Sequence, residues 1–196
     1  RDISPPNVLL SYTGEVKLTD FGLATSTLKL EKTSPGVIFG TPSYMSPEQV
    51  TGATDQDCRA DIYSLGATIY ELVTGQAPFQ GNAPDKIIEM QVNGTVEDPA
   101  ALNPKLSPGI CWLLEKMLAK KRTARQQDWA AVHVDIVKVR KKKIVGAALP
   151  EGASTLRRNR PKSGRQAVAP RIQEKKSALP QVVGIMALLA VAAAVV

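Results

Sequence analysis

The chain opens with RDISPPN at residues 1–7, and DFG follows at residues 20–22. Between these stretches, two short apolar runs, Val8–Leu10 and Val16–Leu18, flank turn-forming residues that include Gly14. Apolar runs on either side of such a turn predict a β-hairpin. A hairpin at this place would bring the residues just before and just after it to one site.

Three polar side chains around the hairpin suit the chemistry of phosphates. Asp2, Asn7 and Asp20 supply hard oxygen donors, which Mg²⁺ prefers as ligands. Phosphoryl transfer needs a positioned metal ion and a group that orients the hydroxyl, with little covalent help from the protein. An isolated Asp or Asn beside a turn is usually only a turn former. The spacing of all three favours the phosphate interpretation.

The rest of the chain to residue 137 has the pattern of a mainly helical domain. Helices are predicted over residues 61–73, over residues 84–92, after the Ser-Pro pair at 107–108 and along an apolar stripe over 129–137. The first of these is apolar on nearly every side and ends at Gly75, which predicts a buried helix. Residues 23–46 predict a long functional loop. Cys58 and Cys111 fit buried free thiols in a reducing compartment.

The positive charge is concentrated near the C-terminal end. The formal net charge is +7, whereas residues 138–176 hold 13 Lys/Arg and 2 Glu, which leaves −4 for the remainder. Residues 150–181 lack apolar periodicity, and the whole segment 138–181 is interpreted as a flexible basic linker. Such a segment suits an anionic lipid surface. Binding to nucleic acid is disfavoured because no aromatic residues interleave with the charges.

The last residues, Val182–Val196, carry no charge. As a helix they would span about 22 Å, whereas a bilayer needs about 20 residues. Because the run stops with the chain, we expect a truncated transmembrane helix, with a buried helix or a weak tail anchor as alternatives. The basic segment before it predicts a single-pass protein of the cell membrane with its folded part in the cytoplasm.

Four motifs, in order, resemble those of the protein kinase family. RDISPPN followed by DFG is similar to the catalytic loop H-R-D-x-x-x-x-N and its D-F-G. GTPSYMSPE at residues 40–48 resembles the substrate-docking loop, DIYSLG at 61–66 the start of the central buried helix, and Arg125 the family's late arginine. The resemblance covers about residues 1–137 and is strongest to bacterial membrane-anchored serine/threonine kinases. It implies an α+β fold, namely a mainly helical C-terminal lobe with short β-hairpins.

The resemblance implies a role for each matching residue of the site. Asp2 would be the catalytic base that orients the acceptor hydroxyl, and Asn7 and Asp20 would bind Mg²⁺. Leu9 would form part of the floor beneath the adenine of ATP. Thr41 would form a hydrogen bond near Asp2 and favour Ser or Thr acceptors.

Other matching residues would be structural or regulatory. Asp61 would hold the backbone of the catalytic loop, and Glu48 would form a buried ion pair with Arg125. Arg1 would pair with a phosphorylated residue of the activation loop, residues 23–46. The candidates for that phosphate are Thr33 first, then Ser34, Thr25 and Thr27. The alternative is a solvated Ser/Thr-rich loop without regulation.

The pattern departs from the family at Ser4, where most serine/threonine kinases have a lysine that contacts the γ-phosphate. A hydroxyl brings no charge, so stabilisation of the transition state is expected to be weaker or supplied from elsewhere. Lys121 and Arg122 replace a usual Asp-Pro pair, with a minor effect expected. The glycine-rich loop, strand lysine and partner glutamate of the N-terminal lobe are absent, and residue 1 is Arg. We therefore expect a fragment that alone is inactive and poorly stable, because its central helix exposes apolar surface.

The sequence thus predicts part of a serine/threonine protein kinase that uses ATP and Mg²⁺ to phosphorylate protein substrates. A dimer would allow autophosphorylation. The alternative function is a pseudokinase that acts as a scaffold or signalling switch. Retention of Asp2, Asn7 and Asp20 argues against the pseudokinase, and Ser4 argues mildly for it.

Overall fold

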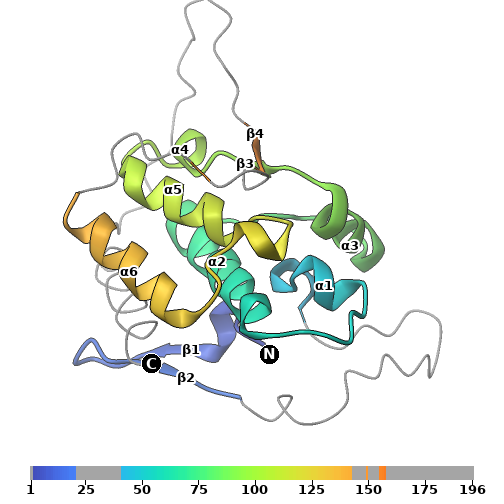
Figure 1. Ribbon diagram of the computed structural model, residues 1–196, viewed down its shortest axis with the longest axis horizontal. Coiled ribbons are helices and arrows are strands. Elements are labelled where there is room, and N and C mark those ends of the chain that lie inside the picture. The colour runs from blue at the N-terminus through green and yellow to red at the C-terminus, as the bar shows by residue number, and fades with distance from the viewer. Residues whose placement is uncertain (1, 21–40, 143–148, 150–154, 158–196) are drawn as a thin grey trace, which may run out of the picture.

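The computed structural model describes residues 2–20, 41–142, 149 and 155–157 (Figure 1). The elements, in chain order, are η1 (Pro5–Asn7), β1 (Val8–Leu10), β2 (Val16–Leu18), η3 (Pro42–Tyr44), α1 (Pro47–Val50), α2 (Cys58–Thr74), α3 (Pro84–Asn93), β3 (Val96–Glu97), α4 (Pro99–Leu102), α5 (Pro108–Met117), η4 (Arg122–Ala124), α6 (Trp129–Arg140) and β4 (Leu156–Arg157). The described part is mainly helical, with two small sheets of two strands each. The predicted helical lobe with short β-structure is therefore confirmed.

The β1–β2 hairpin is present at the predicted residues. Its strands are antiparallel, with Val8 opposite Leu18 and Leu10 opposite Val16. The turn closes with Ser11 N–H donating to a carbonyl across the turn at 2.8 Å, and Gly14 adopts a φ of +85°, which glycine tolerates without strain. Figure 1 shows the hairpin along one edge of the helical body.

Helix α2 forms the centre of the hydrophobic core. Asp57 caps its first turn by accepting from Arg59 N–H, and Gly75 ends it in the left-handed conformation. All residues from Ile62 to Tyr70 are buried, and α2 contacts η3, α4, α5 and α6. The expectation that this helix exposes apolar surface is therefore wrong, because neighbouring elements cover it. The predicted range 61–73 was too short by one turn at its start, where Asp57 supplies the cap.

The other predicted helices are also present. Ser107 caps α5 by accepting from Ile110 N–H at 3.3 Å. Helices α2 and α5 approach closely at Gly66, where an added Cβ would lie 2.7 Å from Met117 Cβ. Figure 1 shows α5 and α6 side by side with α2, and α5 contacts both of the other helices.

Both cysteines are free thiols, but the predicted full burial is wrong. Cys58 and Cys111 are each only partly buried. Cys58 lies at the first turn of α2, where its thiol is 3.8 Å from the carbonyl of Gln127. Burial raises the pKa of the Cys58 thiol above its usual value, which makes it a poor nucleophile.

The segment after residue 137 differs from the predicted linker at three described places. Helix α6 continues to Arg140, Leu149 packs on a small apolar cluster of α5–η4, and Leu156 and Arg157 form β4 beside β3. Single apolar residues in a basic stretch show no periodicity, so the sequence pattern could not indicate these contacts. Among the described residues, no helix is both long and apolar enough to cross a bilayer. The predicted transmembrane segment, 182–196, lies outside them.

Candidate active site

The side chain of Asn7 fastens the loop at residues 2–7. Its Nδ2 donates to the backbone oxygen of Asp2 at 2.9 Å and to Asp2 Oδ2 at 3.3 Å. Its N–H donates to the carbonyl of Ser4 at 3.0 Å across η1. The structure therefore brings Asp2 and Asn7 together. Because Nδ2 is turned toward Asp2, Oδ1 is the amide atom that can face a cation.

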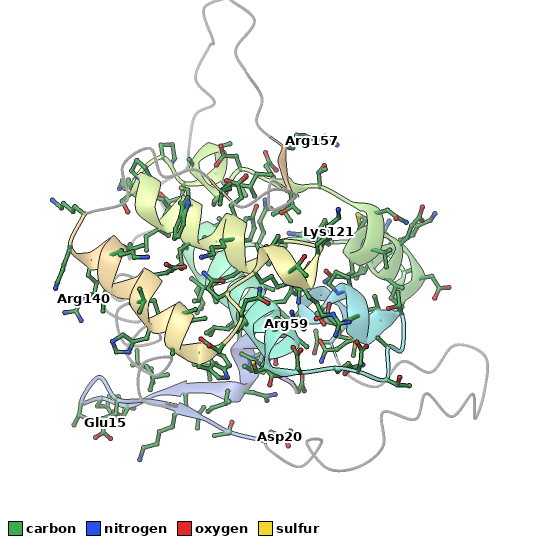
Figure 2. The ribbon with its side chains drawn as sticks, viewed as in Figure 1. Glu15, Asp20, Arg59, Lys121, Arg140 and Arg157 are labelled. Atoms are coloured by element: carbon green, nitrogen blue, oxygen red, sulfur yellow. The ribbon has the colours of Figure 1, made fainter. Side chains whose placement is uncertain are left out.

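Asp20 reaches the same end of the hairpin. Thr19 donates to the carbonyl of Asn7 through its N–H at 2.8 Å and through its hydroxyl at 3.2 Å. Asp20 follows directly, is exposed, and has a φ of 58°, a left-handed conformation that aspartate adopts more readily than most residues. Figure 2 shows Asp20 at the end of the hairpin opposite Glu15, which lies at the turn. The hairpin thus places Asp20 one residue beyond the partner of Asn7.

The donor atoms of Asn7 and Asp20 fit Mg²⁺. This ion usually takes one or two protein ligands and completes its octahedron with water and phosphate oxygens. In the part of the chain that the structure describes, no group of three or more His, Cys, Asp or Glu side chains could hold a metal. An Asn amide oxygen and an Asp carboxylate match the small number of protein ligands that a phosphate-bound Mg²⁺ takes.

The hairpin presents apolar side chains to solvent. Leu9 is 53% exposed, Leu10 is 49% exposed, and Tyr12 at the turn is fully exposed. Apolar side chains gathered on one exposed element suit contact with a ligand or another domain. The role of Leu9 beneath adenine stays a prediction.

Thr41 lies exposed at the start of η3, and two long-range bonds hold this short helix. Tyr44 Oη donates to Glu71 Oε2 of α2 at 2.5 Å, and Gln91 Nε2 of α3 donates to the carbonyl of Pro42 at 2.9 Å. Burial, followed by the bond to Glu71, raises the pKa of Tyr44. The docking loop is thereby fixed between α2 and α3. The approach of Thr41 to Asp2 stays a prediction.

The ion pair expected between Glu48 and Arg125 is present and buried. A capping box between Ser46 and Gln49 starts α1 and positions Glu48. Arg125 Nη1 and Nη2 donate to the two Glu48 carboxylate oxygens at 2.6 and 2.9 Å. The guanidinium also donates to the carbonyls of Ala119, Lys120 and Arg59. The pair thus joins α1, the start of α2 and the α5–η4 loop.

Asp61 lies in the first turn of α2, and its predicted contact with the backbone of the catalytic loop stays a prediction.

A contact between α2 and the loop at residues 2–7 was not predicted from the sequence. Thr68 Oγ1 lies 3.3 Å from the carbonyl of Ile3 and 2.8 Å from the carbonyl of Ser64. A polar residue within the apolar run 61–73 was the available signal, because a buried hydroxyl needs a partner.

Gln91 and Lys120 were also missed. Gln91 is fully buried and accepts from Tyr63 Oη at 2.6 Å. Lys120 Nζ donates to the carbonyls of Met90 and Gln91 at 3.1 and 2.6 Å and lies 4.1 Å from the centre of the Phe79 ring. Burial, together with the charge of Arg125, lowers the pKa of Lys120 to about 7. Nothing local in the sequence separates Lys120 from the neighbouring exposed lysine.

Lys121 and Arg122 stand where the kinase family usually has Asp-Pro, and Arg122 makes a surface contact there. Arg122 pairs with Asp55 at 2.7 Å and also donates to its carbonyl at 2.8 Å. The bond to Arg122 lowers the pKa of the Asp55 carboxyl. The pair is exposed, so the expected minor effect on stability stays a prediction.

Three predicted regulatory residues, Arg1, Thr33 and Ser34, lie outside the described residues, as do Thr25 and Thr27.

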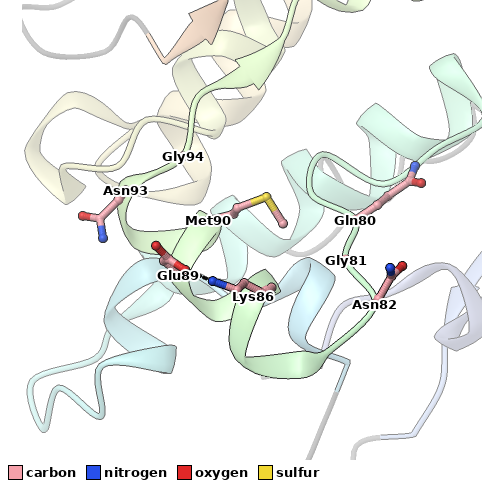
Figure 3. A pocket seen from close by; sticks show the side chains of 8 residues that line it. All are labelled: Gln80, Gly81, Asn82, Lys86, Glu89, Met90, Asn93 and Gly94. Atoms are coloured by element: carbon pink, nitrogen blue, oxygen red, sulfur yellow. Dashed lines mark hydrogen bonds and ion pairs between the residues drawn. The ribbon is translucent and has the colours of Figure 1, made fainter.

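A separate pocket of about 610 Å³ lies between α3 and the loop before it. Figure 3 shows Lys86 and Glu89 of α3 lining it, joined by an ion pair of 3.1 Å, with Gln80 and Asn82 on the loop. None of the predicted site residues lines this pocket.

Comparison with known proteins supports the same interpretation. A model of the protein kinase domain matches residues 1–135. The chain is 41% identical over 133 residues to the DNA damage-responsive serine/threonine-protein kinase RqkA of Deinococcus radiodurans, covering 67% of this chain and 20% of that protein. It is 36% identical over 151 residues to the serine/threonine-protein kinase PknL of Mycobacterium tuberculosis, covering 77% and 37%. It is 36% identical over 141 residues to PknB of the same organism, covering 71% and 22%.

With this match and these bonds around Asp2 and Asn7, the chain belongs to the protein kinase family. The relatives are bacterial serine/threonine kinases. The chain spans between 20% and 37% of the length of these three relatives.

Proposed function

We propose that this chain supplies the helical half of the active site of a serine/threonine protein kinase, which transfers the γ-phosphate of ATP to protein hydroxyls. The observation that supports the proposal is the bonded arrangement of Asp2 and Asn7, together with the bond from Thr19, the residue before Asp20, to the carbonyl of Asn7. These are the residues that match the family's base and metal-ligand positions. A second lobe that carries the glycine-rich loop and the strand lysine would complete the site.

The site residues act by positioning and by charge. Asp2 is held by Asn7 and would accept a hydrogen bond from the acceptor hydroxyl, which orients that oxygen for attack. Asn7 Oδ1 and the Asp20 carboxylate would hold Mg²⁺, which neutralises charge on the phosphate oxygens. Leu9 would lie against the adenine, and Thr41 would narrow the acceptor site for Ser or Thr.

Ser4 bears on how charge is stabilised in this site. It is only 2% exposed, and its short neutral side chain cannot neutralise the γ-phosphate. We propose that another cation performs that task in the assembled kinase. This position is the one observation that favours the second candidate, a pseudokinase that binds partners without transferring phosphate.

Regulation by the activation loop is also proposed. Its described end, at Thr41 and η3, is anchored to α2 and α3, so a phosphate placed earlier in the loop would act on a fixed support. Phosphate at Thr33 adds a charge of about −1.5 to −2 and would pair with Arg1. Ser34, Thr25 and Thr27 are the secondary candidates, and transfer between two copies would supply the phosphate.

An assay with isotopically labelled ATP tests these proposals in the complete kinase. The wild type is expected to label protein Ser or Thr and the peptide 23–46. Asp2→Asn should lower the rate by about 10²–10⁴-fold, because the group that orients the hydroxyl is lost. Asp55→Asn removes an exposed carboxylate that pairs with Arg122 and serves as the matched control. A wild type that binds ATP without transferring phosphate would establish the pseudokinase, and an unlabelled 23–46 peptide from active enzyme would refute the proposal for Thr33.

The same reasoning leads us to propose that residues 1–196 alone neither bind ATP tightly nor transfer phosphate. The exposed Leu9 and Leu10 lie on the hairpin, where a nucleotide-binding lobe would cover them. Measurable turnover of ATP by the isolated chain would refute this proposal.

We also propose that residues 182–196 belong to a membrane-spanning helix and that the lobe faces the cytoplasm of a single-pass protein. The support is the uncharged run and the net charge of +11 over residues 138–176 before it. That segment would also contact anionic lipids. Release of the protein from membranes by alkaline carbonate would contradict this proposal.

A further inference from the structure

Residues 155–157, which follow the part of the chain matched by the protein kinase domain model, contact the helical body at β3. Leu156 and Arg157 of β4 lie parallel to Val96 and Glu97 of β3, in register. Val96 N–H donates to the carbonyl of Thr155 at 2.8 Å. Figure 1 shows β4 beside β3.

Side chains as well as backbone make this contact. Leu156 is 9% exposed and belongs to the main core, and Thr155 is 8% exposed with Oγ1 3.4 Å from the carbonyl of Leu118. Leu149 packs on the apolar cluster of Ala119 and Ala124. These contacts lie on α5, the loop that follows it and β3. The described residues 149 and 155–157 therefore contact the body at two places.

We propose that the edge of β3 is a docking site for the chain's own residues 155–157, which form a detachable strap with Leu149 as a second anchor. A strand that adds to an open sheet edge gains backbone bonds from the edge and specificity from alternate side chains. Here Leu156 is the inward anchor, and Arg157 faces outward opposite Glu97. The ladder has only two residue pairs, so it can open without unfolding the core.

The occupant is the same chain rather than a second copy. The thirteen residue-to-residue steps from Lys142 to Thr155 can span up to about 43 Å when extended, so one chain can close the strap on itself. Docking at β3 places Arg157 at that edge, so the basic residues that follow it in the sequence would start there.

Amide hydrogen exchange on the 196-residue chain tests the strap. Leu156→Asp removes the buried anchor and should make the Val96 amide exchange at least about tenfold faster, with the α2 amides unchanged. Arg157→Ala, on the outward face of the same strand, is the matched control and should leave Val96 protected. Unchanged exchange of Val96 in Leu156→Asp overturns the proposal. Equal acceleration of the α2 amides also overturns it, because the strand would then be inseparable from the core.

A second measurement tests the docking site itself. A synthetic peptide of residues 149–160, added to the Leu156→Asp chain, should restore protection of Val96. Failure to restore it at millimolar peptide overturns the edge as a docking site. Sedimentation of the wild type should show a monomer. A dimer that Leu156→Asp converts to monomers would show that a second copy supplies the strand and would overturn docking within one chain.

Discussion

Arg125 shows how one side chain can support the shape of the site without touching it. Its guanidinium donates to both carboxylate oxygens of Glu48 and to three backbone carbonyls. Its Cζ lies 4.8 Å from the centre of the Tyr63 ring. The charge is fully removed from solvent, with a side-chain exposure of 0% against 6% for Glu48. Since a buried charge depends on its partner, each residue of the pair constrains the other.

Replacing Glu48 by Gln should therefore destabilise the lobe by about 3–5 kcal/mol, because Arg125 keeps its charge in a buried site without a carboxylate. Urea unfolding of the 196-residue chain measures the change. Asp55→Asn, which removes an exposed acid paired with Arg122, is the control and should have a much smaller effect. Equal effects of the two substitutions would show that burial does not matter here.

The residues named in the site were predicted to different extents. Asp2, Asn7 and Glu48 could be found because each stands in a motif at a fixed spacing. Thr68 and Gln91 stand in no such motif, and their partners lie 65 and 49 residues away in the sequence, so for Thr68 the sequence offered only the general signal of a buried hydroxyl. Long-range bonds of this kind depend on the packing of whole helices, which no local pattern encodes.

Helix α3 is held at its C-terminal end by a lysine from another element. Lys120 Nζ donates to the carbonyls of Met90 and Gln91, and the negative end of a helix favours a cation there. The same helix carries Gln91, which contacts the docking loop through Pro42. Lys120 thus supports the helix that holds η3 through Gln91.

The lowered pKa of Lys120, about 7 in the folded chain, predicts a pH dependence of stability. An unfolded lysine has a pKa of about 10.4, so between about pH 7 and pH 10 the unfolded chain holds a proton that the folded chain has released. Unfolding free energy should rise with pH across that window and not below it. In Lys120→Met this rise should be lost, whereas exposed Lys121→Met should retain it. An unchanged profile in Lys120→Met, measured by urea unfolding, would contradict the assignment.

Among the elements, the hairpin and the long helices could be predicted because their patterns are local. Val8–Leu10 and Val16–Leu18 matched the observed strands, and Gly75 marked the end of α2. The short strand β4 could not be predicted, since two residues in a basic stretch show no alternation. Its position depends on the open edge of β3.

The described part of the molecule combines a buried helical body with an exposed hairpin, which carries the proposed metal ligands Asn7 and Asp20 at its open end. The core around α2 fixes η3 and the α5–η4 loop, while Leu9, Leu10 and Asp20 remain exposed on the hairpin. In the proposed function, a nucleotide and a second lobe would cover this exposed hairpin. The family match over residues 1–135 agrees with the extent of the helical body.

The proposed binding of Mg²⁺ by Asn7 and Asp20 is tested most directly by the affinity of the complete kinase for ATP, measured with and without Mg²⁺. Wild type should bind ATP more tightly with Mg²⁺ than without it. In Asp20→Asn, the factor by which Mg²⁺ tightens ATP binding should be at least about tenfold smaller, which corresponds to about 1.4 kcal/mol. Glu15→Gln, at the opposite end of the same hairpin, is the matched control and should behave as wild type. If Asp20→Asn keeps the full effect of Mg²⁺ on ATP binding, the hairpin does not hold the metal and the proposed active site is wrong.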